Sequence, residues 1–401
     1  MKHKGMTLIE LMVAMTIGLG ITLAITSVLI ASENHKRTTT STNDAQQTGT
    51  YAYYALDKVL RGAGSALAGS AFPIDVGVLG CHLNASAAGT VIFPRTTPFP
   101  QPFANFLLGA TNPLNVAPVL IGRQQSQDGV SDVIMVMGGS GSAGGVSRQI
   151  TGGGTATNAT LDNTVGFAQN DLLLVSQGGV ADCLLEQVHT FTTPTLGFAA
   201  TDIYYTATGG TTSMATLAGS TASYVTPLGN ADANSVQFML FGIDLNRTLY
   251  SYDLLRNMEK YLSTGGDSAQ AIADGVVQMN ALYGLDTNGD GIQDAWAAPG
   301  GTTDPTWDAN TVMTSPTKMR QIVSVRIALV MRGEYYDTKR KPDGTPIPVS
   351  PATLTIFNNL VNGGGASLSQ PINLSPTEQQ FRYRVFEFTV PLRNMLLLAG
   401  A

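Results

Sequence analysis

The chain has 401 residues and a formal net charge of −6, and its charged residues make up 12 %, about half the usual share of roughly 25 %. The hydrophobic fraction of 43 % is ample for a core, and 44 glycines with 19 prolines favour a β-rich, loop-rich body over a helical bundle. The acidic balance argues against a nucleic-acid-binding protein, which needs a basic face. Four histidines and two cysteines limit metal and thiol chemistry.

The N-terminus begins with a basic leader, residues 1–5, followed by an apolar run from Met6 to Ala31. At about 1.5 Å per residue this run is long enough to cross a bilayer core of about 30 Å. The lysines of the leader favour a cytoplasmic N-terminus. The alternative is a cleaved secretory signal, but the run ends in Leu29-Ile30-Ala31, which lacks a small-residue cleavage site. We expect residues 6–31 to form a transmembrane and assembly helix.

Glu10 is the one charged residue inside this run. A carboxylate near the centre of a spanning helix costs roughly 2.5–3.5 kcal/mol, and such residues usually have a function. The plainer interpretation is an acid at the membrane interface. The context, Gly5-Met6-Thr7-Leu8-Ile9-Glu10, resembles the signal of type IV prepilins, although members of that family usually have Phe where Met6 stands. The resemblance implies that a prepilin peptidase cuts between Gly5 and Met6 and N-methylates Met6.

Beyond the apolar run, residues 32–69 are predicted to continue the helix as an amphipathic segment. Tyr51, Ala55 and Val59 recur at helical spacing and suit packing on a head domain. Pro73 ends the helix by the residue before it. Residues 70–401 are expected to form a β-rich head, so the predicted fold class is α+β: a long N-terminal helix packed on a large β-rich head, as in pilins.

The head alternates runs of Val, Ile and Leu with Gly, Thr, Asn and Pro clusters, which predicts strands. The expected strands are residues 90–93, 119–121, 132–137, 171–175, 184–190, 203–206, 235–241, 248–253, 275–283, 322–331 and 382–390. Residues 254–262 and 353–360 are candidate short helices. Two lobes are possible in a head of this size, with a boundary in the Thr/Gly/Ser stretch 207–220.

Several head segments resemble PilW-type minor pilins in the same order. They are Asp171–Val175, Thr248–Asp253, Gly275–Asp286, Val323–Arg326 and Phe386–Asn394. The resemblance implies a minor pilin of the type IV pilus that acts in a priming or tip complex, and thereby in adhesion or twitching motility. The alternatives are a minor pseudopilin of a type II secretion system and, from a different class, a membrane-anchored ligand-binding protein or enzyme. No catalytic constellation was found in the sequence, so an enzyme is not expected.

The resemblance also implies partners and a location. The partners are the prepilin peptidase, other minor pilins, the major pilin, the inner-membrane assembly platform and membrane lipid, with no nucleic acid. The chain is expected to span the inner membrane once, with a cytoplasmic N-terminus and a periplasmic head, and to enter the extracellular pilus after assembly. In the filament, Glu10 is expected to meet the Met6 amine of an adjacent subunit.

Cys81 and Cys183 are the two thiols. A head outside the inner membrane lies where disulfides persist. A bridge between them closes a loop of about 100 residues, which is worth roughly 4.7 kcal/mol in the chain-entropy model. The alternatives are two separate buried thiols, or a zinc site that also uses His82 and His189. We expect the disulfide.

The segment from Asp286 to Asp294 is the best ligand candidate. Asp286, Asn288, Asp290 and Asp294, with the carbonyl of Ile292, match the first positions of an EF-hand calcium loop. The acid at the last position of such a loop is missing. Asn/Asp/Gly turns form without metal, so calcium and a plain turn both stay open, and no cofactor is required.

Two further motifs have plainer interpretations. Residues 139–144 match G-x-G-x-x-G, but the Thr/Gly-rich segment after them shows no helical pattern to receive a pyrophosphate. Residues 339–344 form a charged turn, expected to be a solvated hairpin tip, with a small adhesive contact as the alternative.

Overall fold

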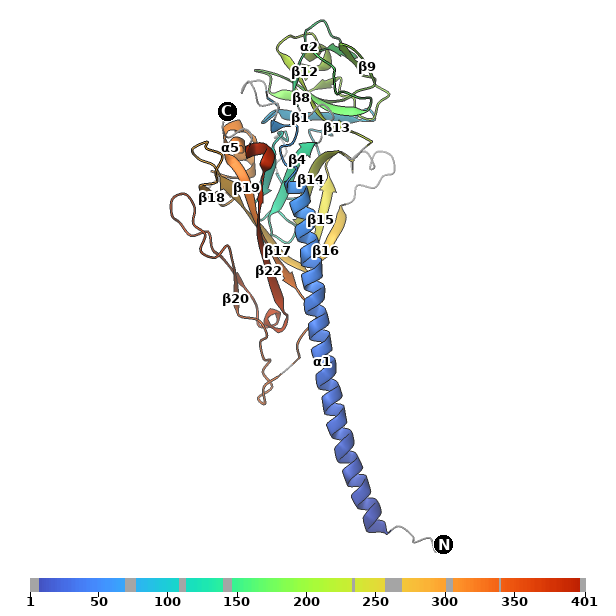
Figure 1. Ribbon diagram of the computed structural model, residues 1–401, viewed down its shortest axis with the longest axis vertical. Coiled ribbons are helices and arrows are strands. Elements are labelled where there is room, and N and C mark those ends of the chain that lie inside the picture. The colour runs from blue at the N-terminus through green and yellow to red at the C-terminus, as the bar shows by residue number, and fades with distance from the viewer. Residues whose placement is uncertain are drawn as a thin grey trace.

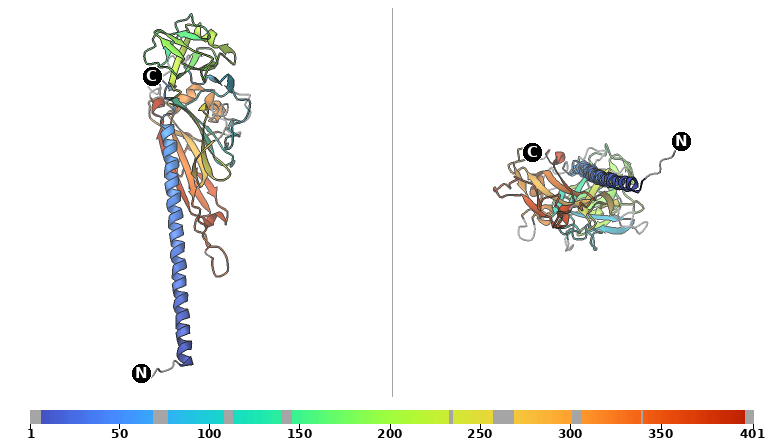
Figure 2. Two further views of the ribbon diagram at one scale, coloured as in Figure 1. Left: turned by 90° about the vertical axis from the view of Figure 1, so that its right-hand side faces the viewer. Right: turned by 90° about the horizontal axis from the view of Figure 1, so that it is seen from below.

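The long N-terminal helix and the β-rich head are both present in the computed structural model (Figure 1). The structure describes residues 7–68, 77–107, 113–139, 146–232, 235–256, 269–300, 306–338 and 340–396. Helix α1 (Leu8–Leu60) extends well beyond the head, and its C-terminal half lies against the strands (Figures 1 and 2). The predicted α+β class is confirmed.

Helix α1 is continuous because nothing in its sequence breaks it. It contains no proline, and Gly18 and Gly20 do not interrupt it. Within the apolar run, the hydroxyl groups of Thr16, Thr22 and Thr26 donate to backbone carbonyls of the preceding turn. These polar side chains are therefore satisfied without water, as a helix in a bilayer requires.

The C-terminal half of α1 presents a stripe of small and aliphatic residues to the head. The buried members are Ala45, Gly49, Ala52, Leu56 and Leu60. At Gly49 an added Cβ would lie 2.4 Å from the ring of Phe386 in strand β22, so the close approach of helix and sheet requires glycine. Tyr53 packs edge-on against Phe388 with ring centroids 4.5 Å apart.

The α-helix ends earlier than the continuation predicted to residue 69. Its last residue is Leu60, and turns follow to Leu67. Gly64 adopts a left-handed φ of 73°, and its N–H donates to the carbonyl of Met137. This turn directs the chain away from the helix and into the head.

The other elements of the head are short. The strands are β1 (His82–Ala87), β2 (Thr90–Phe93), β3 (Val119–Gly122), β4 (Val133–Gly139), β5 (Arg148–Gln149), β6 (Asn158–Thr160), β7 (Asp171–Gln177), β8 (Asp182–Gln187), β9 (Thr190–Thr192), β10 (Thr195–Gly197), β11 (Thr208–Gly209), β12 (Thr212–Ser213), β13 (Ser223–Asn230), β14 (Val236–Ile243), β15 (Thr248–Asp253), β16 (Gln270–Asp274), β17 (Val276–Leu285), β18 (Ala295–Ala297), β19 (Ile322–Arg332), β20 (Thr353–Ile356), β21 (Gln370–Asn373) and β22 (Tyr383–Pro391). The helices are α2 (Met214–Ala218), α4 (Ala309–Met313), α5 (Pro316–Gln321), α6 (Arg393–Leu396) and the 3-10 turn η2 (Glu378–Gln380).

The strands gather at two levels of the head (Figures 1 and 2). Farthest from the N-terminus, a six-stranded sheet has the order β2-β1-β8-β7-β13-β5, and β6, β10 and β9 form a smaller sheet. Nearer to α1 lie a five-stranded sheet, β16-β15-β14-β4-β3, and a four-stranded sheet, β18-β17-β19-β22. Helix α1 contacts β16, β19 and β22, so it packs on both of the latter sheets.

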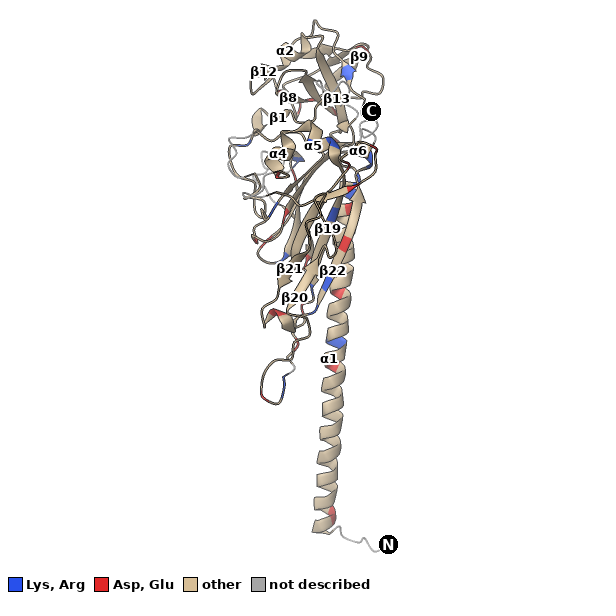
Figure 3. Ribbon diagram, turned by 90° about the vertical axis from the view of Figure 1, so that its left-hand side faces the viewer, with Lys and Arg blue, Asp and Glu red and all other residues tan. Residues whose placement is uncertain are grey.

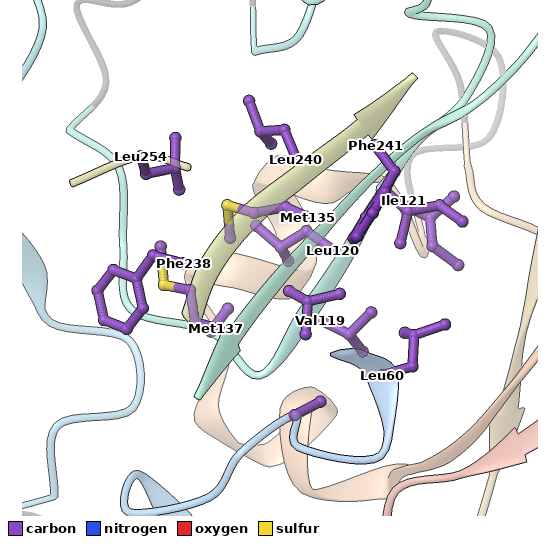
Figure 4. Packing of buried hydrophobic residues seen from close by; sticks show 14 of the residues in the cluster. Leu60, Val119, Leu120, Ile121, Met135, Met137, Phe238, Leu240, Phe241 and Leu254 are labelled. Carbon is purple, nitrogen blue, oxygen red and sulfur yellow. The ribbon is translucent and has the colours of Figure 1, made fainter. Parts of the chain in front are cut away.

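The largest hydrophobic core joins the end of α1 to the five-stranded sheet. Leu60 lies beside Val119, and the side chains of Met135, Phe238 and Leu240 continue the cluster along the strands (Figure 4). A separate core fills the upper sheet and includes Leu173, Val175 and Val225.

Several expectations for the head were wrong. Residues 353–360 do not form a helix, because Thr353–Ile356 is strand β20, paired with β21. Residues 203–206 form a single bridge through Tyr204 instead of a strand. The stretch 207–220 contains the β11–β12 hairpin and α2, between strands β8 and β13 of one sheet, so it does not separate two sheets. Most of the candidate helix at 254–262 lies outside the described residues.

Cys81 and Cys183 form the expected disulfide, with their Cα atoms 5.8 Å apart. The bridge is possible because β1 and β8 are parallel neighbours, which brings the two chain segments together. It closes a loop across a sequence separation of 102 residues.

We predict that Cys81→Ser or Cys183→Ser lowers the free energy of unfolding by about 4 kcal/mol, because the unfolded chain regains the freedom that a long closed loop removes. The measurement is chemical denaturation of the oxidised protein, with a non-reducing gel to follow the bridge. Full labelling of both thiols in the native periplasmic protein would contradict the bridge.

Candidate functional site

The start of α1 is the first candidate site, and Glu10 is at its centre. Thr7 caps the helix: the backbone N–H and the hydroxyl of Thr7 donate to Glu10 Oε2 at 2.9 and 2.8 Å, and the N–H of Glu10 donates to Thr7 Oγ1 at 3.4 Å. This reciprocal arrangement is a capping box. Gly5 and Met6 lie outside the described residues.

The capping box was not anticipated from the sequence, although Thr followed three residues later by Glu is its signature. The negative charge of Glu10 lies at the positive end of the helix dipole, where it is favourable. Glu10 thus has hydrogen-bond donors within its own helix, and its carboxylate stays exposed.

The apolar half of α1 is not buried against any described part of the isolated chain. Its large side chains are exposed; for example, Leu8 is 77 % and Leu19 is 66 % exposed. Among the described residues, α1 is the one helix that is long and apolar enough to cross a membrane. An apolar surface of this extent requires lipid or other helices around it.

A groove of about 520 Å³ lies where α1 meets the head. Its lining is rich in charge on both sides: Glu33, Lys36, Arg37 and Asp44 come from α1, and Asp274, Arg332 and Glu334 come from the head. Arg37 pairs with Glu33 at 3.1 Å within the helix. In the lining of the groove, the N–H of Tyr335 donates to Ser41 Oγ at 3.1 Å, which joins the head to the helix.

The acidic loop from Asp286 to Asp294 is held by hydrogen bonds to its own backbone. Asp286 accepts from the N–H groups of Gly289 and Gly291, and Asp290 accepts from that of Ile292. The carboxylate of Asp294 accepts hydrogen bonds from the N–H and the hydroxyl of Thr287. Among the described residues no group of three or more His, Cys, Asp or Glu side chains converges as a metal site would require. The loop is an Asx-type turn, and calcium binding by it stays a prediction.

The zinc alternative finds no support in the placement of its residues. The two cysteines are bonded to each other. His82 faces Asp182 at 3.3 Å and His189 faces Asp202 at 2.8 Å, so each histidine has a carboxylate partner of its own. Most of the glycine-rich motif at 139–144 lies outside the described residues.

Glu186 is a buried carboxylate that the sequence did not single out. It is fully buried on β8; its Oε1 accepts from the N–H of Thr206 at 3.2 Å, and its Oε2 accepts no hydrogen bond from any described residue. Burial, opposed by the Thr206 hydrogen bond and reinforced by the nearby charge of Asp202, raises the pKa of Glu186 to about 8. Burial likewise raises the pKa of Asp132 to about 6.

We predict that Glu186→Gln stabilises the head at high pH and has little effect at low pH. The folded pKa lies above the ordinary value of 4.5, so the wild type loses stability as the pH rises from about 4.5 to about 8. The gain at pH 9 should be on the order of 4 kcal/mol. The measurement compares the melting temperatures of the variant and the wild type at pH 4 and at pH 9. Asp132 is present in both proteins, so its own titration cancels in this difference. An equal difference at both pH values would contradict a buried, titrating Glu186.

Comparison with known protein families gives two matches. Residues 1–19 match the prokaryotic N-terminal methylation motif, and residues 243–394 match the type IV pilus-assembly protein W family. No curated protein and no solved structure matches the chain. The second match covers the predicted PilW-like segments from Thr248 onward, while the one at Asp171–Val175 lies outside it.

The methylation motif at the start of a long apolar helix that packs on a β-rich head, together with the second match, supports a pilin associated with the type IV pilus. The resemblance to the PilW family of minor pilins is confirmed. The description of that family is pilus assembly, a structural task.

Proposed function

We propose that the protein is a minor pilin of the type IV pilus that acts in the complex that primes or caps the growing filament, and thereby in adhesion or twitching motility. The observation that carries the proposal is the division of α1 into an exposed apolar half and a half that packs on the head. The first half suits a membrane before assembly and a bundle of other pilin helices afterwards. This role needs no bound cofactor.

The proposed location follows from the same helix. The chain spans the inner membrane once, with its N-terminus in the cytoplasm and its head in the periplasm. The prepilin peptidase removes residues 1–5 and methylates Met6. The assembly platform and the other pilins then take the helix into the filament.

Glu10 has a proposed role in this transfer. Cleavage frees an α-amine on Met6, which has an ordinary pKa of about 7.7–8.0 and is mostly positive at neutral pH. Two opposite charges in an apolar filament core each need a partner, because an unpaired buried charge costs several kcal/mol. We propose that Glu10 pairs with the Met6 amine of an adjacent subunit. The alternative is a pair within one helix, since Met6 and Glu10 are four residues apart.

Three variants separate the charge of Glu10 from its role in the helix cap. Glu10→Gln keeps an acceptor for the Thr7 donors but removes the charge, Thr7→Ala removes the cap hydroxyl but keeps the charge, and Glu10→Ala removes both. If the charge directs assembly, Glu10→Gln and Glu10→Ala enter pili at least tenfold less than wild type, and Thr7→Ala enters normally. The measurement is the amount in sheared pili relative to the amount in the membrane. Wild-type recruitment of Glu10→Gln at equal membrane abundance would show that the charge has no role.

Processing is tested by the intact mass of protein purified from membranes. The expected chain begins at N-methylated Met6. Gly5→Ala should be cleaved, because it stays small, whereas a bulky residue at position 5 should block cleavage. An intact Met1 start in cells with active prepilin peptidase would contradict the proposal.

Gene deletion separates the filament systems. Loss of surface pili with secretion intact supports a type IV pilus pilin, whereas loss of secretion with pili intact supports a pseudopilin of type II secretion.

A further inference from the structure

A hairpin with a basic tip extends from the head along α1. It lies between the end of β19 and the start of β20, and its arms meet in a bridge between Arg340 and Pro346. The tip is ordered: the N–H of Lys341 donates to the carbonyl of Thr345 at 2.8 Å, and the N–H of Gly344 to that of Lys341 at 2.9 Å. Figure 1 shows this hairpin as the lowest part of the head, directed toward the N-terminal half of α1, and Figure 3 marks the charges on it.

The tip carries positive charge that the protein does not neutralise. Arg340 and Lys341 are exposed, and neither forms an ion pair with a described residue. The carboxylate of Asp343 accepts hydrogen bonds from the hydroxyl and the N–H of Thr345, which lower the pKa of Asp343 and keep it ionised, so the tip from Arg340 to Thr345 has one net positive charge. The sequence adds Lys339, which lies outside the described residues. The turn thus presents a cationic end with an exposed aliphatic residue, Ile347, beside it.

The base of the hairpin is fixed against α1. The hydroxyl of Tyr335 donates to Asn34 Oδ1 at 3.2 Å, about two helical turns below the contact of its N–H with Ser41. The arms are held to the turn η2, where the N–H of Asp337 donates to Gln380 and that of Val349 to Gln379. The backbone of Tyr335 therefore leaves the head beside Ser41, ten residues beyond the end of the apolar run at Ala31, and its side chain reaches toward Asn34.

Simple lengths then place the tip beside the surface of a membrane that α1 crosses. Ten helical residues rise about 15 Å, whereas the six residues from Tyr335 to Lys341 can extend up to about 20 Å. The apolar run is about 39 Å long, more than the hydrocarbon core of about 30 Å, so its last turns lie in the headgroup layer. A hairpin directed along α1 reaches that layer.

We propose that the tip from Arg340 to Thr345 binds the anionic phosphate headgroups of the membrane in which α1 is anchored. The inference rests on the proposed membrane location of α1. The occupant is lipid because the tip lies beside the membrane-spanning segment and its net charge is opposite to that of the headgroups. The contact orients the head before assembly and is lost when the helix leaves the membrane for the filament.

The test uses the full-length protein in vesicles, with a fluorescent dye on Ile347→Cys and the native disulfide left intact. A lipid with a quencher on its headgroup reports contact. One set of vesicles is phosphatidylcholine, and the other is an equal mixture of phosphatidylcholine and phosphatidylglycerol. The same dye on Thr192→Cys, an exposed residue of β9 at the far end of the head, is the control.

We expect the tip dye to be quenched in the mixed vesicles and the control dye not to be. Each basic residue near an anionic surface is worth about a fivefold change in binding, so Lys341→Gln should weaken tip binding about fivefold and Arg340→Gln/Lys341→Gln about 30-fold. Lys341→Gln leaves the backbone bonds of the turn in place, so its effect is not a folding defect.

Four outcomes would overturn the inference. Quenching that is equal in both lipids and unchanged by the substitutions means that the tip charge does not bind the headgroups. Quenching that increases with the amount of protein per vesicle, and not with the fraction of anionic lipid, means that the tip binds a second copy of the chain. Failure of the protein to float with the vesicles rejects the proposed membrane location as well, whereas flotation without quenching rejects only the hairpin contact.

Discussion

The whole arrangement depends on one helix that meets two different environments. The first half of α1 is apolar on all sides, so lipid or other apolar helices must cover it. The second half is amphipathic and is covered on one side by the head. The contact between this second half and the head is close, because a Cβ added at Gly49 would lie 2.4 Å from the ring of Phe386. The buried residues of α1 from Ala45 to Leu60 therefore attach the head to the helix over several turns.

Contacts near residues 34–41 extend the attachment of the head toward the apolar half of α1. Tyr335 fixes the lower end of the head to Asn34 and Ser41, just beyond the apolar run. The charged groove and the basic hairpin lie at this same junction, and the disulfide lies in the upper sheet, far from it (Figures 1 and 2). The part of the chain that matches the PilW family includes β19, β22 and the hairpin, so the surface nearest α1 is also the part with known relatives. The upper sheet has no such match.

The sequence predicted the features that depend on long, uniform patterns. The spanning helix follows from its apolar run, and strands β4, β7, β14, β17 and β19 follow from apolar runs that their sheets bury. The predicted strands β15 and β22 also form, although they contain few Val, Ile and Leu residues and only one residue of β22 is buried. The sequence did not predict strands such as β13 and β20. The sequence of β13 mixes Ser, Thr, Pro and Gly without a regular pattern, the alternation of β20 covers only four residues, and pairing with distant partners decides both structures. Residues 353–360 illustrate this: their local pattern suits a helix, but β21 supplies the backbone partners of a strand. The sequence context identified Glu10 but not the hydrogen bonds between Glu10 and Thr7. It also did not identify the contact of Tyr335 with α1, because this contact joins residues about 300 positions apart.

The capping box changes how the energetics of Glu10 should be understood. A lone carboxylate in an apolar run looks costly, but two Thr7 donors and the helix dipole already stabilise its charge. Thr7 would be the second residue of the processed chain, so the cap would survive cleavage. Under the proposed function, incorporation into a filament is then an exchange of partners and not the burial of a bare charge: Glu10 gives up some hydrogen bonding to Thr7 and gains the amine of a neighbour. The net cost of incorporation is then the difference between two sets of partners for one carboxylate, which is smaller than the cost of burying that carboxylate with none.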